Sequence, residues 1–515
     1  MIFANVLSQL PIALPAISYR AVAPELVLFG GALLILLVSA TTGRKEHPGL
    51  YRAIALAAAV VEGGFSGYQL YLAQGAKASL AVAGSIAYDG FSAFAGIVVA
   101  AVLILGILIG PGFVQRIAGD GPEYLVLVLV SAMGALVMAQ GEDLIVIFIG
   151  LEILSIALYV LVGYRIGDGL AREAAFKYFI LGGFSSAIFL YGTALVYGAT
   201  GSTNLAKIAS FLSVNVLVHN GVLLFGLALL LLGFGFKVSA VPFHLWSPDV
   251  YQGAPTSVTG YMAAMAKVGA FAALIRVFDV AFGSQITYWR PIVVGLAILS
   301  MLFGALFALR QRELKKILAY SSINHAGFIL LGVYAGTAAA ISNTLFYLVA
   351  YAVIVVGTFG LVSIIQDSLG VVEGSCSLDQ LRGLARSRPA LATVTAIMVL
   401  AQAGAPFTTG FLAKFSIIVS VVEIREYWVA VVAMISAAIA VAFYLRIVLA
   451  MFRGEQEQEV EGERVLAIQG AATEIPGRRP ALAWIGVSLS LLFTIGFGVF
   501  PQPLLDLAAR AHIIG

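Results

Sequence analysis

Apolar residues gather in long runs that are separated by short polar breaks along almost the whole chain. A run of about 20 apolar residues is long enough to cross a hydrocarbon core of about 30 Å as an α-helix. Such runs occupy fourteen ranges: 22–41, 52–72, 90–110, 123–139, 142–164, 172–199, 221–245, 254–280, 290–309, 315–335, 340–365, 389–421, 427–452 and 482–501. The pattern therefore predicts an all-α polytopic membrane protein with about 14 transmembrane helices.

The composition agrees with insertion into a membrane. Of the 515 residues, 61% are hydrophobic and only 11% are charged, whereas soluble proteins average about 25% charged residues. The mean hydropathy is +1.02. A chain of this length could form several soluble domains, but the successive spans favour one helical membrane domain.

Basic residues are distributed unequally between the two sides of the predicted bundle. Eighteen Lys and Arg residues fall in one set of alternate connections, and seven fall on the other side, which includes both termini. Because cytoplasmic loops are enriched in Lys and Arg, we expect both termini on the non-cytoplasmic side. The long polar stretch 453–480 is then a cytoplasmic loop, and its alternating charges are typical of a solvated linker.

Four lysines interrupt the apolar runs. Lys177, Lys237, Lys267 and Lys414 each lie well inside a predicted span. A lysine at the centre of such a helix costs about 2.5 to 3.5 kcal/mol on insertion, so exposure of all four to lipid is unfavourable. The sequence therefore predicts a buried, partly hydrated polar path whose amines exchange protons or cations.

Further titratable groups accompany these lysines. Glu152 and Lys177 lie at similar depths in consecutive spans, which predicts an acid–amine pair in mid-membrane; a fixed structural ion pair is the alternative. His244 follows Lys237 by seven residues and is a candidate proton relay, as is His325 in the sequence SSINHAGF. For either histidine, a hydrogen-bonded core residue without a transfer role is the competing interpretation.

The chain contains an internal repeat. A shift of 170 positions superposes Leu144 on Leu314 and Tyr164 on Tyr334, and a slightly smaller shift superposes Pro242 on Pro406. Each unit holds five spans, and an odd number forces the second copy to run inverted through the membrane. The predicted division is 1–122 (helices 1–3), 123–280 (first repeat), 290–452 (second repeat), 453–480 (polar loop) and 481–515 (last helix). Prolines inside helices 7 and 12 predict that both are broken.

Several kinds of chemistry are excluded for this chain alone. The one cysteine, Cys376, cannot supply the thiolates of an iron–sulfur cluster, and the five histidines are too scattered for a metal site. There is no Walker A loop and no dinucleotide-binding fingerprint. Redox or nucleotide chemistry, if involved, must belong to another chain, and we expect no nucleic-acid partner.

Three stretches together carry a resemblance to a known family: HLWSPDVYQGAPTSVTGYMAAMAKVGAF, RELKKILAYSSINHAGF and AGAPFTTGFLAKF. From about residue 20 to 500 the chain resembles the N-type antiporter-like subunit of proton-pumping NADH:quinone oxidoreductase, respiratory complex I. PDVYQGAPT is rather specific for the N-type against the related L- and M-types. Ser257, where a second proline is usual, and Asn324 depart from the family pattern.

The resemblance implies an antiporter-like fold with two inverted five-helix repeats and broken helices 7 and 12. It implies that Glu152 and Lys177 form a coupled pair and that Lys237, Lys267 and Lys414 continue a hydrated proton axis, to which His244 is added as a candidate. FMN, the iron–sulfur clusters and the quinone are expected in partner subunits. The expected partners are the M-type subunit, small helical subunits and the lipid of a bacterial cell membrane.

Two other functions remain open at this point. The same fold could serve as a subunit of a multi-part sodium/proton antiporter, and PDVYQGAPT favours the respiratory complex over this alternative. The chain could also be a passive spacer, in which case neutralising Lys237 would leave pumping intact.

Overall fold

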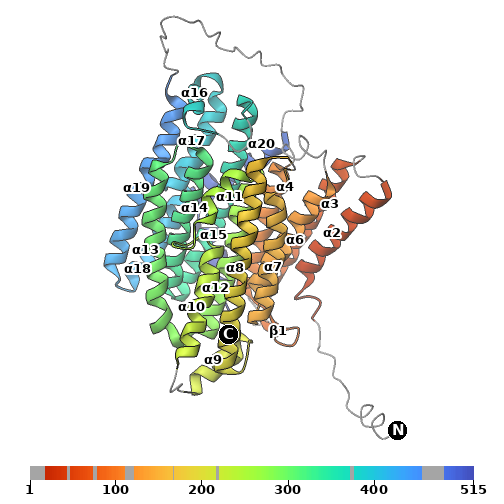
Figure 1. Cartoon of the computed structure of the whole chain (residues 1–515), viewed down its shortest axis with the longest axis vertical. Coiled ribbons are helices and arrows are strands. Elements are labelled where there is room, and N and C mark those ends of the chain that lie inside the picture. Colours follow the sequence, from red (N-terminus) through yellow and green to blue (C-terminus); the bar gives the residue numbers. More distant parts are fainter. Residues whose placement is uncertain are drawn as a thin grey trace, which may run out of the picture.

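Most of the described residues of the computed structural model are helical. The described ranges are 18–42, 47–73, 78–110, 121–165, 167–215, 220–371, 376–454 and 481–514. Figure 1 shows the helices packed side by side as one bundle. The longer helices are α2 (Ala23–Thr42), α3 (Pro48–Ala73), α4 (Gly90–Ile109), α6 (Pro122–Gln140), α7 (Leu144–Val162), α8 (Gly169–Thr200), α10 (Gly221–Lys237), α12 (Thr256–Arg276), α13 (Ile286–Arg310), α14 (Leu314–Ala335), α15 (Ala338–Leu369), α17 (Pro389–Ala403), α18 (Thr409–Glu423), α19 (Tyr427–Phe452) and α20 (Ala481–Val499).

Short elements connect and close the bundle. They are the antiparallel strands β1 (Ser79–Ala81) and β2 (Ile86–Tyr88), the helices α9 (Leu205–Val214), α11 (Trp246–Gly253), α16 (Leu384–Ser387) and α21 (Gln502–Ala509), the π-helix η1 (Val277–Ala281), and the 3₁₀ turns η2 (Gly283–Gln285) and η3 (Asp379–Leu381). The strands, α9 and the end of the chain lie at one end of the bundle, and α16 lies at the other (Figure 1).

All fourteen predicted spans contain helices, which confirms the all-α membrane fold. Twelve helices in the described ranges are long and apolar enough to cross a membrane. The remaining two spans are interrupted: α10 ends at Lys237 inside the span 221–245 and α11 begins directly after it, while the span 389–421 contains α17 and most of α18. The predicted breaks in helices 7 and 12 are therefore confirmed. The predicted loop 453–480 lies outside the described residues except for 453 and 454.

Each break exposes backbone carbonyl groups at the end of the preceding helix, and a side chain supplies a donor for them. At the first break the Trp246 indole donates to the carbonyl of Phe236 over 3.0 Å. At the second, Lys414 donates to the carbonyls of Gln402 and Ala403, both at 2.9 Å. Because no water is available in a hydrocarbon core, these side-chain bonds allow the helices to end inside the bundle.

The two halves of the chain repeat each other in detail. In the first, Leu144 and Leu205 join the α6–α7 connection to the segment before α9; in the second, Leu314 and Leu378 join the α13–α14 connection to the segment before η3. Both pairs of backbone bonds measure 2.8–2.9 Å. The joined segments lie at opposite ends of the bundle (Figure 1), as inverted repeats require. The division at 123–280 and 290–452 stays a prediction.

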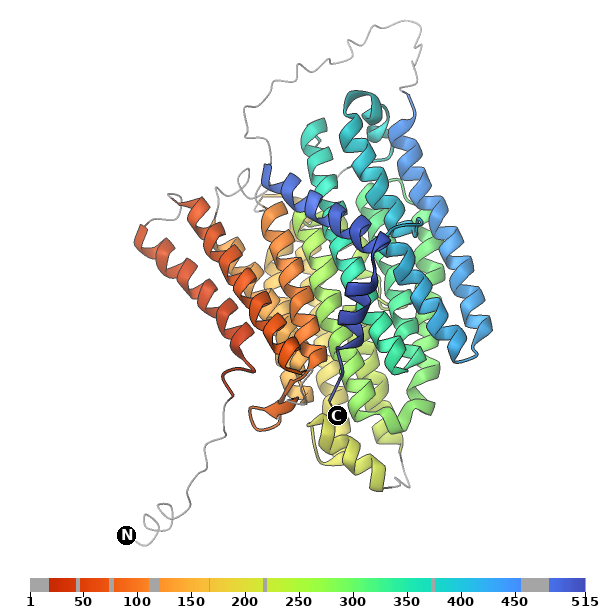
Figure 2. The same cartoon turned by 180° about the vertical axis from the view of Figure 1, so that it is seen from behind.

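The centre of the bundle is formed by α12, α14 and α15, which are buried over nearly their whole apolar length. By contrast, only about a third of the residues of α2, α3 and α20 are buried, which places these helices at the periphery. Figure 2 shows α20 crossing the back of the bundle obliquely. Two of the four intramembrane lysines, Lys267 and Lys414, therefore lie on or beside the most enclosed helices.

Candidate functional site

Lys237 ends α10 and is almost completely buried, with 3% of its surface exposed. Its Nζ donates a hydrogen bond to the Ser155 hydroxyl of α7. The ring centroids of Tyr159 and Tyr178 lie 5.5 and 5.6 Å from the same nitrogen. The aromatic faces can stabilise an ammonium group, while the hydroxyl can accept or return a proton. The pocket thus suits both protonation states of the amine.

Glu152 lies one turn before Ser155 on α7 and is half-buried. Its Oε1 is buried and has no hydrogen-bond partner among the described residues. The carboxylate is close enough to Lys237 for the two charges to interact electrostatically. Glu152 is therefore a partner of the Lys237 pocket at longer range than a contact ion pair.

Lys177 differs from the other three lysines, because 38% of its side chain is exposed. Its Nζ forms ion pairs with Glu173, one turn earlier on α8, at 2.7 Å and with Asp249 of α11 at 2.8 Å. No ion pair joins it to Glu152 in the part of the chain that the structure describes. The predicted Glu152–Lys177 pair is not a contact pair in this structure, because Glu173 and Asp249 hold the amine, and its coupling during turnover stays a prediction.

Lys267 lies in the middle of α12 with 2% of its surface exposed. Its Nζ donates to the Ser322 hydroxyl of α14 and lies 5.5 Å from the centroid of the Tyr351 ring. Ser322 is also within hydrogen-bond distance of the hydroxyls of Tyr351, at 2.8 Å, and Tyr251, at 3.2 Å. Four helices, α11, α12, α14 and α15, therefore meet at one amine through hydroxyl groups.

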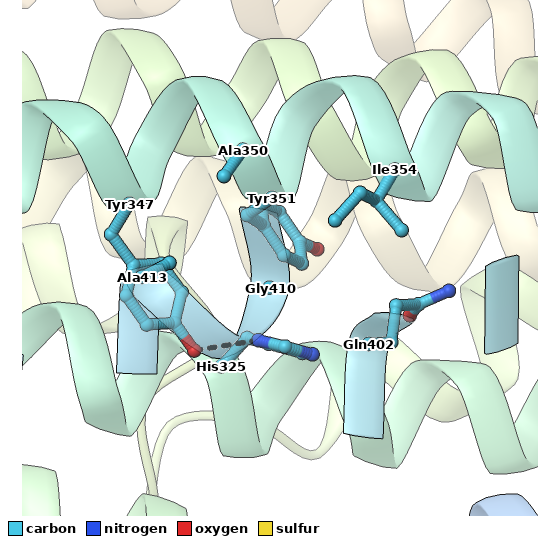
Figure 3. A pocket seen from close by; sticks show the side chains of 8 residues that line it. All are labelled: His325, Tyr347, Ala350, Tyr351, Ile354, Gln402, Gly410 and Ala413. Carbon is cyan, nitrogen blue, oxygen red and sulfur yellow. Dashed lines mark hydrogen bonds between the residues drawn. The ribbon is translucent and has the colours of Figure 1, made fainter. Parts of the chain in front are cut away.

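His325 follows Ser322 by nearly one turn of α14 and is 4% exposed. Its Nδ1 lies 2.7 Å from the Tyr347 hydroxyl and its Nε2 lies 3.1 Å from the Tyr444 hydroxyl. Figure 3 shows the imidazole pointing toward Tyr347 beside a small internal cavity. The cavity lining is His325, Tyr347, Ala350, Tyr351, Ile354, Gln402, Gly410 and Ala413. A ring with a hydroxyl on each nitrogen can pass a proton by changing tautomer.

Lys414 completes the series on α18 with 5% of its surface exposed. Besides the two carbonyls at the end of α17, it has the Phe328 ring at 5.4 Å. Gln402, whose carbonyl it binds, also accepts from the Ser321 hydroxyl at 3.4 Å, and Ser321 contacts Tyr444. Polar groups therefore connect the His325 cavity to Lys414.

His244 lies in the break between α10 and α11 and is half-buried. Its Nδ1 is buried without a hydrogen-bond partner in the described ranges, and no hydrogen bond links it to Lys237. Its expected role as a relay stays a prediction, as do the roles of Glu152, Lys177, Lys237, Lys267 and Lys414.

Sequence reasoning missed the hydroxyl groups that connect the amines. The connecting residues are Ser155, Ser322, Tyr347, Tyr351 and Tyr444. One signal was available, because Ser155 lies three residues from Glu152 and Ser322 lies three residues from His325, which places each pair on one helix face. The tyrosines come from α15 and α19, and only tertiary packing brings them to the site.

Known proteins match both the sequence and the fold. The family model described as "NADH:quinone oxidoreductase/Mrp antiporter, TM" covers residues 141–440. NADH-quinone oxidoreductase subunit N of Parafrankia sp. (strain EAN1pec) is 38% identical, and the match spans 97% of this chain and 96% of that protein. The chain belongs to the family of N-type antiporter-like subunits of NADH-quinone oxidoreductase. The expected resemblance is thereby confirmed.

Other members and structures of this family agree. Subunit N of Acidothermus cellulolyticus is 37% identical over 97% of this chain and 98% of its own length. A chain of respiratory complex I from Thermus thermophilus with bound aureothin is 30% identical and has a TM-score of 0.74, with 94% of this chain and 99% of that chain covered. A chain of the Mrp complex from Dietzia sp. DQ12-45-1b shares the fold, with a TM-score of 0.80 at 24% identity and coverage of 96% and 97%. The antiporter-like fold is common to all of them.

Proposed function

We propose that the chain moves protons across the membrane as a subunit of a proton-pumping NADH-quinone oxidoreductase. One observation carries the proposal. Lys237, Lys267 and Lys414 are each at least 95% buried, and each amine is held by hydroxyl or carbonyl oxygens. Within the described ranges, none of the three has a carboxylate at ion-pair distance. An amine held by neutral oxygens can lose or gain a proton without breaking an ion pair, as a relay requires.

Four groups supply the proposed transfer stations in the central part of the bundle. Protons pass between Lys237, Lys267, His325 and Lys414 through the intervening hydroxyls and the cavity beside His325. Aromatic rings lie between the two pockets: Tyr178, near Lys237, stacks on Trp246 with centroids 4.5 Å apart, and Trp246 packs against Tyr251, which lies within hydrogen-bond distance of Ser322 beside Lys267. Transfer between these two pockets therefore needs water or a small movement of α11.

Glu152 is the proposed coupling group, because its charge acts on Lys237 without fixing the amine in a contact pair. A change in that charge or its position would release the Lys237 proton. Lys177, held by Glu173 and Asp249, and His244, in the break of helix 7, are proposed to modulate this pocket from its exposed side.

The rest of the complex supplies what this chain lacks. We propose that FMN, the iron–sulfur clusters and the quinone site belong to partner subunits. In the described part of the chain, no three His, Cys, Asp or Glu side chains gather as metal ligands. The proposed neighbours are the M-type subunit and small helical subunits in a bacterial cell membrane, with both termini on the non-cytoplasmic side.

A subunit of a sodium/proton antiporter is the alternative, since the Mrp complex shares the fold. That likeness, at 24% identity, concerns the fold alone. Relatives called subunit N, at 35–38% identity, favour the respiratory complex. Dependence of proton movement on NADH and quinone, and its indifference to an imposed sodium gradient, would separate the two functions.

The test uses the purified complex in proteoliposomes, with NADH, a quinone analogue and a pH-sensitive dye. We expect Lys237→Met to reduce proton pumping by about tenfold or more while the chain stays in the complex. Lys207→Met is the matched control, because Lys207 is an exposed amine on α9 and its loss should leave pumping unchanged. Full pumping by the Lys237 variant would overturn the proposal.

A further inference from the structure

Outside the lysine series, three charged side chains meet in a completely buried cluster where α4 begins, α12 ends and α6 connects to α7. Its first residue directly follows β2, so the cluster belongs to the end of the bundle that carries the strands (Figure 1). Arg276, the last residue of α12, binds both carboxylate oxygens of Asp89 at 2.9 Å. Its Nη1 also lies 3.4 Å from Oε2 of Glu142, and its Nε donates to the carbonyl of Ala139 at 2.9 Å. We call Asp89, Glu142 and Arg276 the carboxylate–arginine cluster.

The two carboxylates in this cluster are not equivalent. Asp89 caps α4 by accepting the N–H of Ser92 at 2.8 Å, and it also accepts the N–H of Ile514 at 3.1 Å. Together with Arg276, these bonds use both of its oxygens. Glu142 has one long contact to Arg276, and its Oε1 is buried with no partner in the described residues. A buried oxygen of this kind is costly when charged and is relieved by a proton.

Charge counting leads to the same conclusion. One guanidinium faces two carboxylates, so the cluster carries an excess negative charge unless one acid is protonated. Other charged or titratable groups on the surrounding elements include Tyr88, Asp143, Lys207, Asp279, Arg510 and His512. Lys207, Arg510 and His512 are exposed, and Asp143 accepts from Thr203 and Ile145. Asp279 interacts electrostatically with Arg276, so it adds a further acid and not a cation. Among these described neighbours, no second cation reaches the buried oxygen.

The opposite repeat shows that the fold does not require these acids. At the shift that relates the two repeats, Arg446 of α19 matches Arg276 and Leu309 matches Ala139, and Arg446 donates to the carbonyl of Leu309 as Arg276 does to that of Ala139. At the position matching Glu142 the second repeat has Arg312, and Arg446 forms no ion pair among the described residues. The arginine–carbonyl bond is thus common to both repeats, whereas the acids occur at one end only.

The cluster also holds the end of the chain against the bundle. Ile514 donates to Asp89, and the carbonyl of His512 accepts from Phe91 at 3.1 Å. A Cβ atom at Gly90 would lie 2.7 Å from the carbonyl oxygen of Arg510, so only a glycine lets this segment approach so closely. Residues 510–514 are therefore docked directly on the capping carboxylate of the cluster.

We propose that Glu142 binds one exchangeable proton, and that loss of this proton loosens residues 510–514 from Asp89. With Glu142 protonated, Arg276 and Asp89 form a balanced pair that holds the end of the chain. With Glu142 ionised, both carboxylates compete for Arg276, and water must enter to solvate the excess charge. By the expected topology, this proton exchanges with the non-cytoplasmic side.

The pKa values of the two acids support this assignment. Burial raises the pKa of Glu142 to about 7, against the opposing effect of the Arg276 charge. Burial also acts on Asp89, but Arg276 and the bonds from Ser92 hold the pKa of Asp89 below its usual value. The folded pKa of Glu142 exceeds its ordinary value of 4.5, so the stabilisation is complete at acidic pH and is lost as pH rises through about 7.

Hydrogen–deuterium exchange of the full chain, purified in its native assembly, tests this proposal independently of proton pumping. After correction for the intrinsic pH dependence, we expect exchange in the peptide containing residues 510–514 to rise about tenfold between about pH 6 and about pH 8. In Glu142→Gln, which keeps the shape but cannot ionise, exchange should stay slow at both values. Glu142→Asp, which keeps a carboxyl group, should restore the pH dependence.

Asp506→Asn is the matched control, because it removes an exposed carboxylate from the neighbouring helix α21. It should exchange like the unchanged chain at both pH values. The proposal is overturned if exchange in the unchanged chain does not depend on pH, or if Glu142→Gln keeps the same dependence.

Discussion

The two repeats place different chemistry at matching positions of α7 and α14. At the shift that relates the repeats, Glu152 of the first matches Ser322 of the second, and Ser155 matches His325. In both repeats the serine of the pair binds a buried amine: Ser155 binds Lys237 and Ser322 binds Lys267. A serine contact to lysine is therefore common to both halves, whereas the acid belongs to the first and the imidazole to the second.

This difference assigns different tasks to the two halves. A carboxyl group near Lys237 can influence when the amine releases its proton, because electrostatic interactions act over distance. His325 lies between two tyrosine hydroxyls, one on each ring nitrogen, so a proton can enter the ring at one nitrogen and leave it at the other. In the proposed mechanism, the first repeat therefore switches a proton and the second conducts it.

We expect the largest loss of proton pumping at the position where the two repeats differ in charge. Glu152→Gln removes the acid but keeps its shape, and we expect coupled NADH oxidation and pumping to fall by about thirtyfold. Ser322→Ala, at the matching position, removes one hydroxyl of several around Lys267 and should cost about threefold. Turnover and dye acidification in proteoliposomes measure both. Equal losses in the two variants would contradict the division of tasks.

Gly134 and Gly304, which also match each other at the repeat shift, test what the two halves share. A Cβ atom at Gly304 would lie 2.6 Å from the backbone nitrogen of Asn324, and one at Gly134 would crowd the backbone nitrogen of Leu154 in the same way. Alanine at either site should therefore destabilise the helix pair by about 2 kcal/mol. Thermal release of the chain from the complex measures the effect, with Gly183→Ala, in open space, as control. If alanine destabilised the chain at only one of the two glycines, the two helix contacts would not be equivalent.

The sequence predicted the framework better than the contacts. Run length and the internal repeat predicted the fourteen spans, the inverted arrangement and the breaks near Pro242 and Pro406, because span length and proline chemistry act locally. The depth of Lys177 within its span suggested burial. Instead it pairs with Asp249 of α11, which follows the break and packs against α8, and no local pattern reports that approach.

The charged cluster at the end of α12 was missed for a similar reason. Arg276 counted only as one basic residue near a membrane boundary, since its partners Asp89 and Glu142 lie 187 and 134 positions away. Pairings over such distances are set by helix packing and leave no periodic signal in the sequence. The hydroxyl groups that link the lysines are also brought together by helix packing, so the sequence pattern did not reveal them.

His325 tests the conducting half. His325→Gln keeps hydrogen-bonding groups in the cavity but removes the exchange of tautomers, and we expect pumping to fall by about fivefold. Tyr444→Phe removes the hydroxyl beside Nε2 and should give a loss of similar size, since the two groups act in series. The double variant should then lose little more than either single one. If the loss of pumping in the double variant equalled the product of the two single losses, the two side chains would act on separate proton pathways.

Lys177 gives the smallest expected effect and the sharpest test of the resemblance. The resemblance implies that this lysine forms a coupled pair with Glu152, whereas the structure pairs it with Glu173 and Asp249 at an exposed position. Because Lys177 is held by Glu173 and Asp249 and forms no ion pair with Glu152 within the described ranges, Lys177→Met should lower coupled turnover by only about twofold. Asp249→Asn should act in the same direction, because it removes one of the two carboxylates that hold the amine. If Lys177→Met instead matched the loss in Glu152→Gln, and the double variant lost no more, the two side chains would form a coupled pair during turnover, and Lys177 would have to leave Asp249 to reach the acid.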